Sequence, residues 1–106
     1  MQGVVGFKAN FTPPLCMKKQ VHILYSGRVQ GVGFRFTAID IARDLKVCGW
    51  AKNLSDGRVE LVAEAEEGTL KDFLSRLDNY FSRYIQDAET DWKAATGEFK
   101  DFTVEI

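Results

Sequence analysis

Two stretches of helical periodicity, each set between strand-like stretches, constrain the fold of this chain more than any other feature. The first stripe consists of small and aliphatic residues: Ala38, Ile41, Ala42 and Leu45. It predicts an amphipathic helix over residues 34–45. The second stripe is the clearest in the chain and contains Leu70, Phe73, Leu74, Leu77, Tyr80 and Phe81. We expect these side chains to pack in the core, because an aromatic and aliphatic stripe at helical spacing is typical of a buried helix face.

Short β-rich segments surround the two predicted helices. They are 21–26, 47–53, 58–65, 88–93 and 101–106, and Ser55-Asp56-Gly57 predicts a hairpin turn between the second and third. The order strand, helix, strand, strand, helix, strand predicts an α+β, ferredoxin-like βαββαβ sandwich. In this fold two helices cover one face of an antiparallel sheet, here with four to five strands.

Length and composition limit the protein to ordinary globular classes. The 106 residues are 45% hydrophobic and 27% charged, which predicts one globular domain. Residues 1–16 contain the Pro13-Pro14 pair and no sustained periodicity, so we interpret them as a disordered or cloning-derived leader before a domain over 17–106. A membrane span is not predicted, and two cysteines make no disulfide framework, so a cytoplasmic protein is expected.

The net charge of −1 conceals a strong asymmetry. Residues 1–53 carry eight Lys or Arg and two Asp or Glu, whereas residues 54–106 carry six and thirteen. A basic half can indicate nucleic-acid binding. Since the basic residues are scattered, we favour a weakly positive region that attracts a small anion.

The segment between the first strand and the first helix carries the strongest chemical signal. It reads Gly27-Arg28-Val29-Gln30-Gly31-Val32-Gly33-Phe34-Arg35. Glycines allow successive backbone N–H groups to turn inward, and such a nest before a helix N-terminus binds anions. Arg35 adds a permanent charge whose planar donors match phosphate oxygens. The segment is neither a P-loop nor a dinucleotide fingerprint. A plain tight connection with an exposed arginine explains the same glycine content.

A second segment, from Gly49 to Glu60, ends the next strand and enters the hairpin turn. Asn53 lies where the strand gives way to the turn. Asparagine often occupies such positions only to hydrogen-bond its own backbone, so Asn53 alone indicates nothing further.

Taken together, these two segments resemble the acylphosphatase family. Its signature runs Gly-x-Val-Gln-Gly-Val-Gly-Phe-Arg and then Gly-Trp-Val-x-Asn-x-x-Asp-Gly-x-Val-Glu. The first is matched from Gly27 to Arg35 and the second from Gly49 to Glu60, with Ala51 in place of valine. The resemblance covers roughly residues 19–106. It implies the ferredoxin-like fold and hydrolysis of the carboxyl–phosphate bond of a small acyl phosphate. The oligomeric state stays open, and a monomer is expected because nothing in the sequence demands more.

The resemblance also implies roles for individual residues. Arg35 and Asn53 take the catalytic positions. The phosphate cradle comprises Gln30, Gly31, Val32, Gly33 and Phe34, together with Arg35. No metal or cofactor is expected, because the sequence offers no cluster of residues at metal-ligand spacing. An acyl phosphate loses a carboxylate whose conjugate acid has a pKa of about 4, so the leaving group needs no general acid. The single histidine, His22, is read as a satisfied strand residue, and Cys48 as a small buried one.

Two rival interpretations stay open. Ferredoxin-like modules also bind nucleic acid, but these usually carry stacking aromatics on central strands, and the third strand here has none. The second rival interpretation is a non-catalytic acylphosphatase-like regulatory domain, as found in larger carbamoyl-transferring maturation proteins. Because the chain stops at Ile106, a free-standing enzyme without a nucleic-acid or membrane partner is the expectation.

Overall fold

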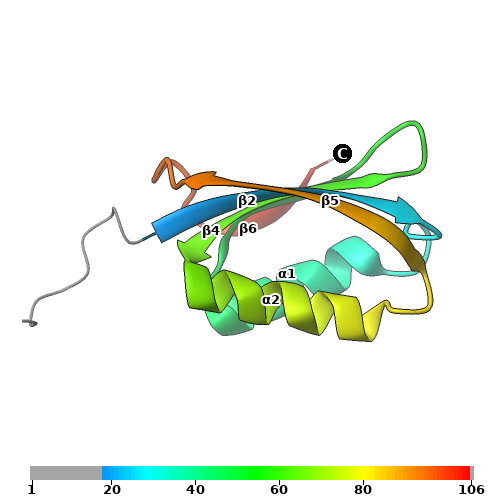
Figure 1. The fold of residues 1–106 in the computed structure, drawn as a ribbon, viewed down its shortest axis with the longest axis horizontal. Coiled ribbons are helices and arrows are strands. Elements are labelled where there is room, and N and C mark those ends of the chain that lie inside the picture. The colour runs from blue at the N-terminus through cyan, green and yellow to red at the C-terminus, as the bar shows by residue number, and fades with distance from the viewer. Residues whose placement is uncertain (1–17, 106) are drawn as a thin grey trace, which may run out of the picture.

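The computed structural model describes residues 18–105 of the chain. The predicted leader over 1–16 lies outside the described residues, and the division at residue 17 stays a prediction. Seven elements follow one another in the order strand, helix, strand, strand, helix, strand, strand (Figure 1). They are β2 (Lys18–Gly27), α1 (Phe34–Leu45), β3 (Cys48–Asn53), β4 (Val59–Glu66), α2 (Glu67–Tyr80), β5 (Ile85–Ala94) and β6 (Phe102–Glu105).

The strands form one five-stranded sheet in the order β5-β2-β4-β3-β6, and both helices lie on the same face of it (Figure 1). This arrangement confirms the ferredoxin-like sandwich. The sheet is mixed rather than wholly antiparallel, because β6 runs parallel to β3, with Trp50 opposite Thr103. The chain leaves β3 through a hairpin, a helix and β5 before it returns as β6, and this long crossover makes the parallel pairing possible.

The predicted helix over residues 34–45 has the bounds of α1. Its end is local: Lys46 adopts a left-handed conformation (φ 60°), and the Val47 N–H donates to the carbonyl of Ala42 at 2.7 Å. Such a bond closes the last turn in the manner of a Schellman motif. The buried residues of α1 are Phe34, Ala38 and Ala42.

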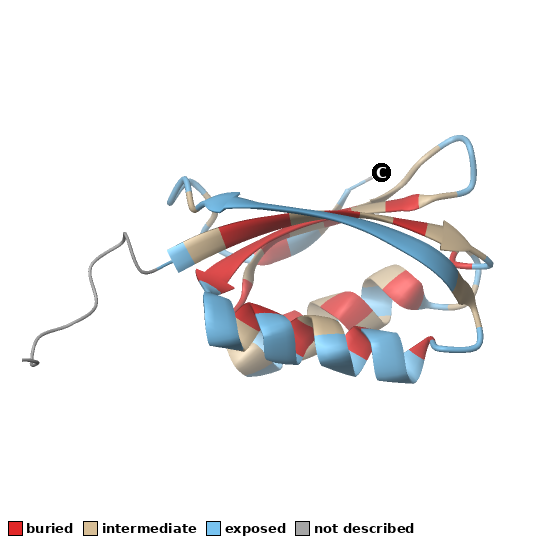
Figure 2. Ribbon diagram, in the orientation of Figure 1, coloured by how far each residue is buried: buried red, intermediate tan, exposed pale blue. Residues whose placement is uncertain are grey.

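The core lies between the helices and the sheet (Figure 2). The helix α2 contributes Leu70, Phe73 and Leu77, which are fully buried. Aromatic rings join the two helices to the sheet: the Phe34 ring lies 4.9 Å from that of Tyr25 and 4.7 Å from that of Phe81. Tilted aromatic contacts at such distances add to the hydrophobic burial.

Two side chains differ from their predicted burial. Tyr80, predicted to lie in the core, is 68% exposed, because α2 ends there and the ring packs against Phe81 from outside. Cys48 is half-buried rather than buried. It begins β3 on the face away from the helices, since Gly49 and Ala51 take the inward positions of that strand.

The sheet face away from the helices is polar at its centre. His22 on β2 is hydrogen-bonded through Nε2 to a carboxylate oxygen of Glu60 on β4 at 2.7 Å, which confirms it as a satisfied strand histidine. Within the described part of the chain, no helix has the length and apolarity needed to cross a membrane.

Candidate active site

The connection from β2 to α1 exposes backbone N–H groups at a helix start. Gly31 and Gly33 both adopt left-handed backbone conformations (φ 79° and 80°), which residues with a Cβ rarely adopt. Gly33 is the N-cap of α1 and makes no side-chain cap, and the first turn holds no acidic residue. The N–H groups of this turn lack intrahelical acceptors, as in every helix, so they offer donors to an anion.

Arg35 lies in that first turn and its side chain reaches toward the sheet. Its Nη1 donates to the backbone carbonyl of Glu105 on β6 at 3.2 Å. Glu105 is the strand partner of Lys52, the residue before Asn53. The arginine therefore connects the N-terminal end of α1 to the carboxyl end of β6, which lies beside the carboxyl end of β3.

Asn53 is the last residue of β3, paired with Val59 on β4. A tight turn follows it: the Leu54 N–H donates to the Arg58 carbonyl at 2.8 Å, and the Gly57 N–H donates to the Leu54 carbonyl at 3.2 Å. This turn confirms the predicted hairpin. Because a short turn restricts the backbone on both sides, it limits where the Asn53 side chain can point.

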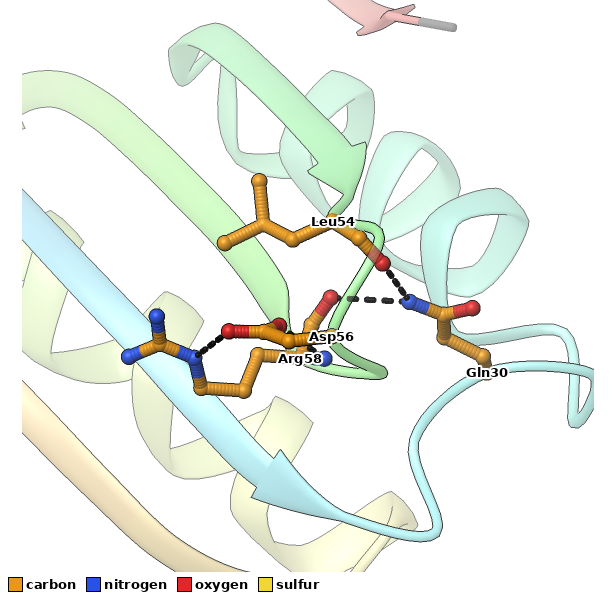
Figure 3. Close-up of polar contacts among 4 residues, drawn as sticks. All are labelled: Gln30, Leu54, Asp56 and Arg58. Atoms are coloured by element: carbon orange, nitrogen blue, oxygen red, sulfur yellow. Dashed lines mark hydrogen bonds and ion pairs between the residues drawn. The ribbon is translucent and has the colours of Figure 1, made fainter.

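Asp56 and Arg58 stabilise the same turn (Figure 3). The Arg58 N–H donates to Asp56 Oδ1 at 3.1 Å, and Arg58 Nε donates to Asp56 Oδ2 at 2.9 Å. The pKa of Asp56 is lowered from its ordinary value, mainly because the Arg58 backbone N–H and then the guanidinium favour the carboxylate.

Gln30 connects the glycine loop to this turn (Figure 3). Its Nε2 donates to the carbonyl of Leu54 at 2.8 Å and to that of Arg58 at 2.9 Å. The side-chain amide thus binds the turn beside Asn53 with both of its N–H groups, so the backbone N–H is the one donor that Gln30 can offer to an anion while these bonds persist.

Five of the seven predicted site residues line one cavity of about 110 Å³: Gly31, Gly33, Phe34, Arg35 and Asn53. Gln30 and Val32 are not part of this lining. Val29 and Phe36 complete it, and sequence reasoning did not select them. Phe36 had one signal, since it is a large apolar residue outside the helical stripe of its own helix.

Larger hollows of about 280 and 300 Å³ lie along β5 and are lined mainly by β2 and β5 side chains. Another, of about 160 Å³, lies beside the connection between β5 and β6. The linings of these three hollows include neither Arg35 nor Asn53. Among residues 18–105, no group of three or more His, Cys, Asp or Glu side chains is placed to hold a metal ion. The cavity beside Arg35 and Asn53 is therefore the candidate site.

Comparison with known proteins identifies the chain. The family model for acylphosphatase matches residues 21–104, a span that contains every lining residue of the cavity. This chain belongs to the acylphosphatase family. It is thus an enzyme that hydrolyses acyl phosphates.

Relatives of this acylphosphatase match it over most of its length. The acylphosphatase of Caldanaerobacter subterraneus subsp. tengcongensis is 37% identical over 89 residues, which are 83% of this chain and 99% of the relative. The crystal structure of the Bacillus subtilis acylphosphatase is 32% identical, with a TM-score of 0.75, over 83% of this chain and 99% of that one. A structure of full-length HypF in the phosphate- and nucleotide-bound form is 27% identical with a TM-score of 0.75. That match covers 83% of this chain but 12% of HypF.

Proposed function

We propose that this acylphosphatase holds the phosphoryl group with Arg35 and the backbone amides of residues 30–35, while Asn53 orients the attacking water. The observation that carries the proposal is a single cavity lined by Gly31, Gly33, Arg35 and Asn53. These residues come from two segments 18 positions or more apart in the sequence.

A bound anion would explain why a positively charged residue, Arg35, occupies the first turn of α1. A cation in the first turn of a helix is poorly placed against the positive end of the helix dipole. An anion between the guanidinium and the turn reverses this, because both then attract it. Arg35 now donates to the neutral carbonyl of Glu105, and a phosphoryl oxygen would offer it a charged acceptor.

The reaction needs little beyond positioning and charge stabilisation. The water oxygen forms a bond to phosphorus as the bond from phosphorus to the acyl oxygen breaks, and the carboxylate leaves with the electron pair. Its conjugate acid has a pKa of about 4, so it departs without a general acid. Arg35 and the amides stabilise charge on the phosphoryl oxygens of a loose transition state.

Asn53 is not a base, because an amide side chain has no useful protonation near neutral pH. Its oxygen accepts a hydrogen bond from the water and so fixes the direction of attack. In this proposal the proton of the water passes to a phosphoryl oxygen of the substrate, so that inorganic phosphate and a carboxylate are the products.

The test measures phosphate release from benzoyl phosphate, with an ordinary phosphate monoester as the comparison substrate. We expect hydrolysis of the first alone. Arg35→Ala is expected to lower kcat/KM by at least ~10³-fold. Arg28→Ala, which removes a charge from an exposed position of the same loop, is the matched control.

Asn53→Ala is expected to lower kcat by roughly 10²-fold, because the water loses its orientation. Inorganic phosphate should inhibit this variant as well as it inhibits the unchanged enzyme. Asn79→Ala, at an exposed position of α2, is its control. Near-normal turnover by Asn53→Ala would remove Asn53 from the mechanism.

Because the two cysteines make no disulfide framework, we propose a cytoplasmic location, which microscopy of the fluorescently tagged protein tests. We further infer that the enzyme acts as a monomer, since one chain supplies the described lining of the cavity. It is also proposed to bind no nucleic acid, because Glu60 lies at the centre of the uncovered sheet face. Sedimentation with and without RNA tests both statements.

A further inference from the structure

The candidate cavity has one apolar wall that solvent reaches. Val29 and Phe34 line it but are only 1% and 2% exposed, so almost all of each side chain belongs to the core. Phe36 also lines it and is 67% exposed. It is the one large apolar side chain of this lining that a bound molecule can contact over much of its ring.

The position of Phe36 follows from the helix it occupies. Consecutive residues of an α-helix are about 100° apart, so Phe36 lies about 200° around α1 from the buried Phe34. The ring therefore faces away from the core, although it directly follows Arg35. A single exposed aromatic residue on a protein surface needs no explanation. An exposed aromatic residue in the wall of a cavity large enough for a phosphoryl group, in contrast, calls for an explanation.

The size of the cavity limits which part of a substrate it can enclose. Its volume of about 110 Å³ corresponds to roughly four groups of the size of water, at ~30 Å³ each. The phosphoryl group is the part that the amides and Arg35 attract. The acyl group must then extend over the rim, where Phe36 provides an apolar surface beside the polar donors.

We propose that Phe36 is the contact surface for the acyl group and that the enzyme prefers acyl phosphates with an aromatic or large apolar acyl group. This inference rests on the proposed function of the cavity. An aromatic acyl group packs against the ring in an offset or edge-on arrangement, whereas the methyl of acetyl phosphate covers little of it. Phe36 thus contributes to specificity and takes no part in bond breaking.

The experiment compares kcat/KM for benzoyl phosphate with kcat/KM for acetyl phosphate in four proteins. These are the unchanged enzyme, Phe36→Ala, Phe36→Leu and Tyr80→Ala. The last is a matched control, because Tyr80 is an aromatic residue with nearly the same exposure (68%) at the end of α2. Both aromatic residues are mostly exposed, so neither alanine variant is expected to unfold the protein.

We expect Phe36→Ala to lower the ratio of the two kcat/KM values by about 3- to 10-fold, the range that aromatic pairs contribute. Phe36→Leu, which keeps an apolar surface, should give a ratio between those of the alanine variant and the unchanged enzyme. Tyr80→Ala should leave the ratio unchanged. An equal loss for both substrates, or a weaker inhibition by inorganic phosphate in Phe36→Ala, would overturn the inference, since Phe36 would then support the phosphate site itself.

The same measurements distinguish failure of the role of Phe36 from failure of the proposed function. Hydrolysis of both acyl phosphates with a ratio that Phe36→Ala does not alter would overturn the role of Phe36 and leave the proposed mechanism intact. Hydrolysis of neither acyl phosphate would overturn the proposed function and the inference with it.

Discussion

Replacing Glu64 by glutamine should be among the most destabilising single changes that leave the hydrophobic core untouched. Glu64 lies on β4 and is only 7% exposed, yet none of the positively charged side chains of residues 18–105 donates to it. Its Oε2 accepts from Gln20 Nε2 at 2.7 Å, from the Thr96 N–H at 2.8 Å and from Thr96 Oγ1 at 2.9 Å. Its Oε1 accepts from the Gly97 N–H at 3.0 Å. The carboxylate therefore ties the connection between β5 and β6, which joins opposite edges of the sheet, to a central strand.

The magnitude follows from counting these donors. A glutamine side chain keeps one acceptor oxygen and turns an N–H₂ group toward donors. With its oxygen in place of Oε2 it loses the bond from Gly97 and makes the other three to a neutral acceptor, and in the opposite orientation it loses three of the four. Hydrogen bonds to a charged acceptor contribute about 1.5–3 kcal/mol each, and a donor left without a partner adds its desolvation cost. Because Thr96 and Gly97 are exposed and water can replace some of these bonds, we expect a loss of about 2–4 kcal/mol in the free energy of unfolding.

The dependence on pH gives an independent check. Burial by itself would raise the pKa of Glu64, but the hydrogen bonds from Thr96, Gln20 and Gly97 outweigh it and the pKa is lowered from its ordinary value of 4.5. A carboxylate with a lowered folded-state pKa contributes stability above its unfolded-state pKa and loses it as the pH falls through the folded-state value. The difference between the unchanged protein and Glu64→Gln should therefore be largest near pH 7 and should narrow below about pH 4.5.

Urea unfolding followed by circular dichroism at pH 7 and at acidic pH measures both effects. Glu66→Gln is the matched control, because it removes the same charge from an exposed position of the same strand and should cost less than about 0.5 kcal/mol. Equal unfolding midpoints for the two variants at pH 7 would refute the role of Glu64. A difference that stays constant as the pH falls would refute the linkage to its ionisation.

Three further outcomes are expected. Gln30→Ala should lower kcat several-fold and the free energy of unfolding by about 1–2 kcal/mol, because two hydrogen bonds to the turn beside Asn53 are lost. Steady-state kinetics and urea unfolding measure the two effects, and an unchanged kcat would contradict the prediction. Gly49→Ala should lower the free energy of unfolding by on the order of 3 kcal/mol or more, because φ is 143° and a Cβ would lie 1.9 Å from the Val62 carbonyl oxygen. Thermal unfolding measures this loss, and Gly68→Ala, at an open position of α2, is the control. Hydrolysis of benzoyl phosphate should persist in excess chelator, and a loss that added Mg²⁺ restores would show that a metal takes part.

Local sequence patterns predict most of the fold. The bounds of α1, the hairpin after Asn53 and the succession of strands and helices along the chain all depend on residues within a few positions of one another, so periodicity and turn residues predict them. The predicted strand over 88–93 is confirmed within the longer β5, and β6 lies within the predicted 101–106. The family signature likewise directed attention to Arg35 and Asn53, which line one cavity; their catalytic roles stay predictions.

The tertiary structure decided what depends on contacts between distant segments. The family signature assigns Gln30 to the cradle, but its side chain meets carbonyls 24 and 28 positions away, and Arg35 donates to a carbonyl 70 positions away. Cys48 faces the uncovered side of the sheet because the register of β3 against β4 places Gly49 and Ala51 inward. Periodicity reports which residues share a face of one element, but not which element that face meets. Strand order and register determine that, and they emerge only when the whole sheet has formed.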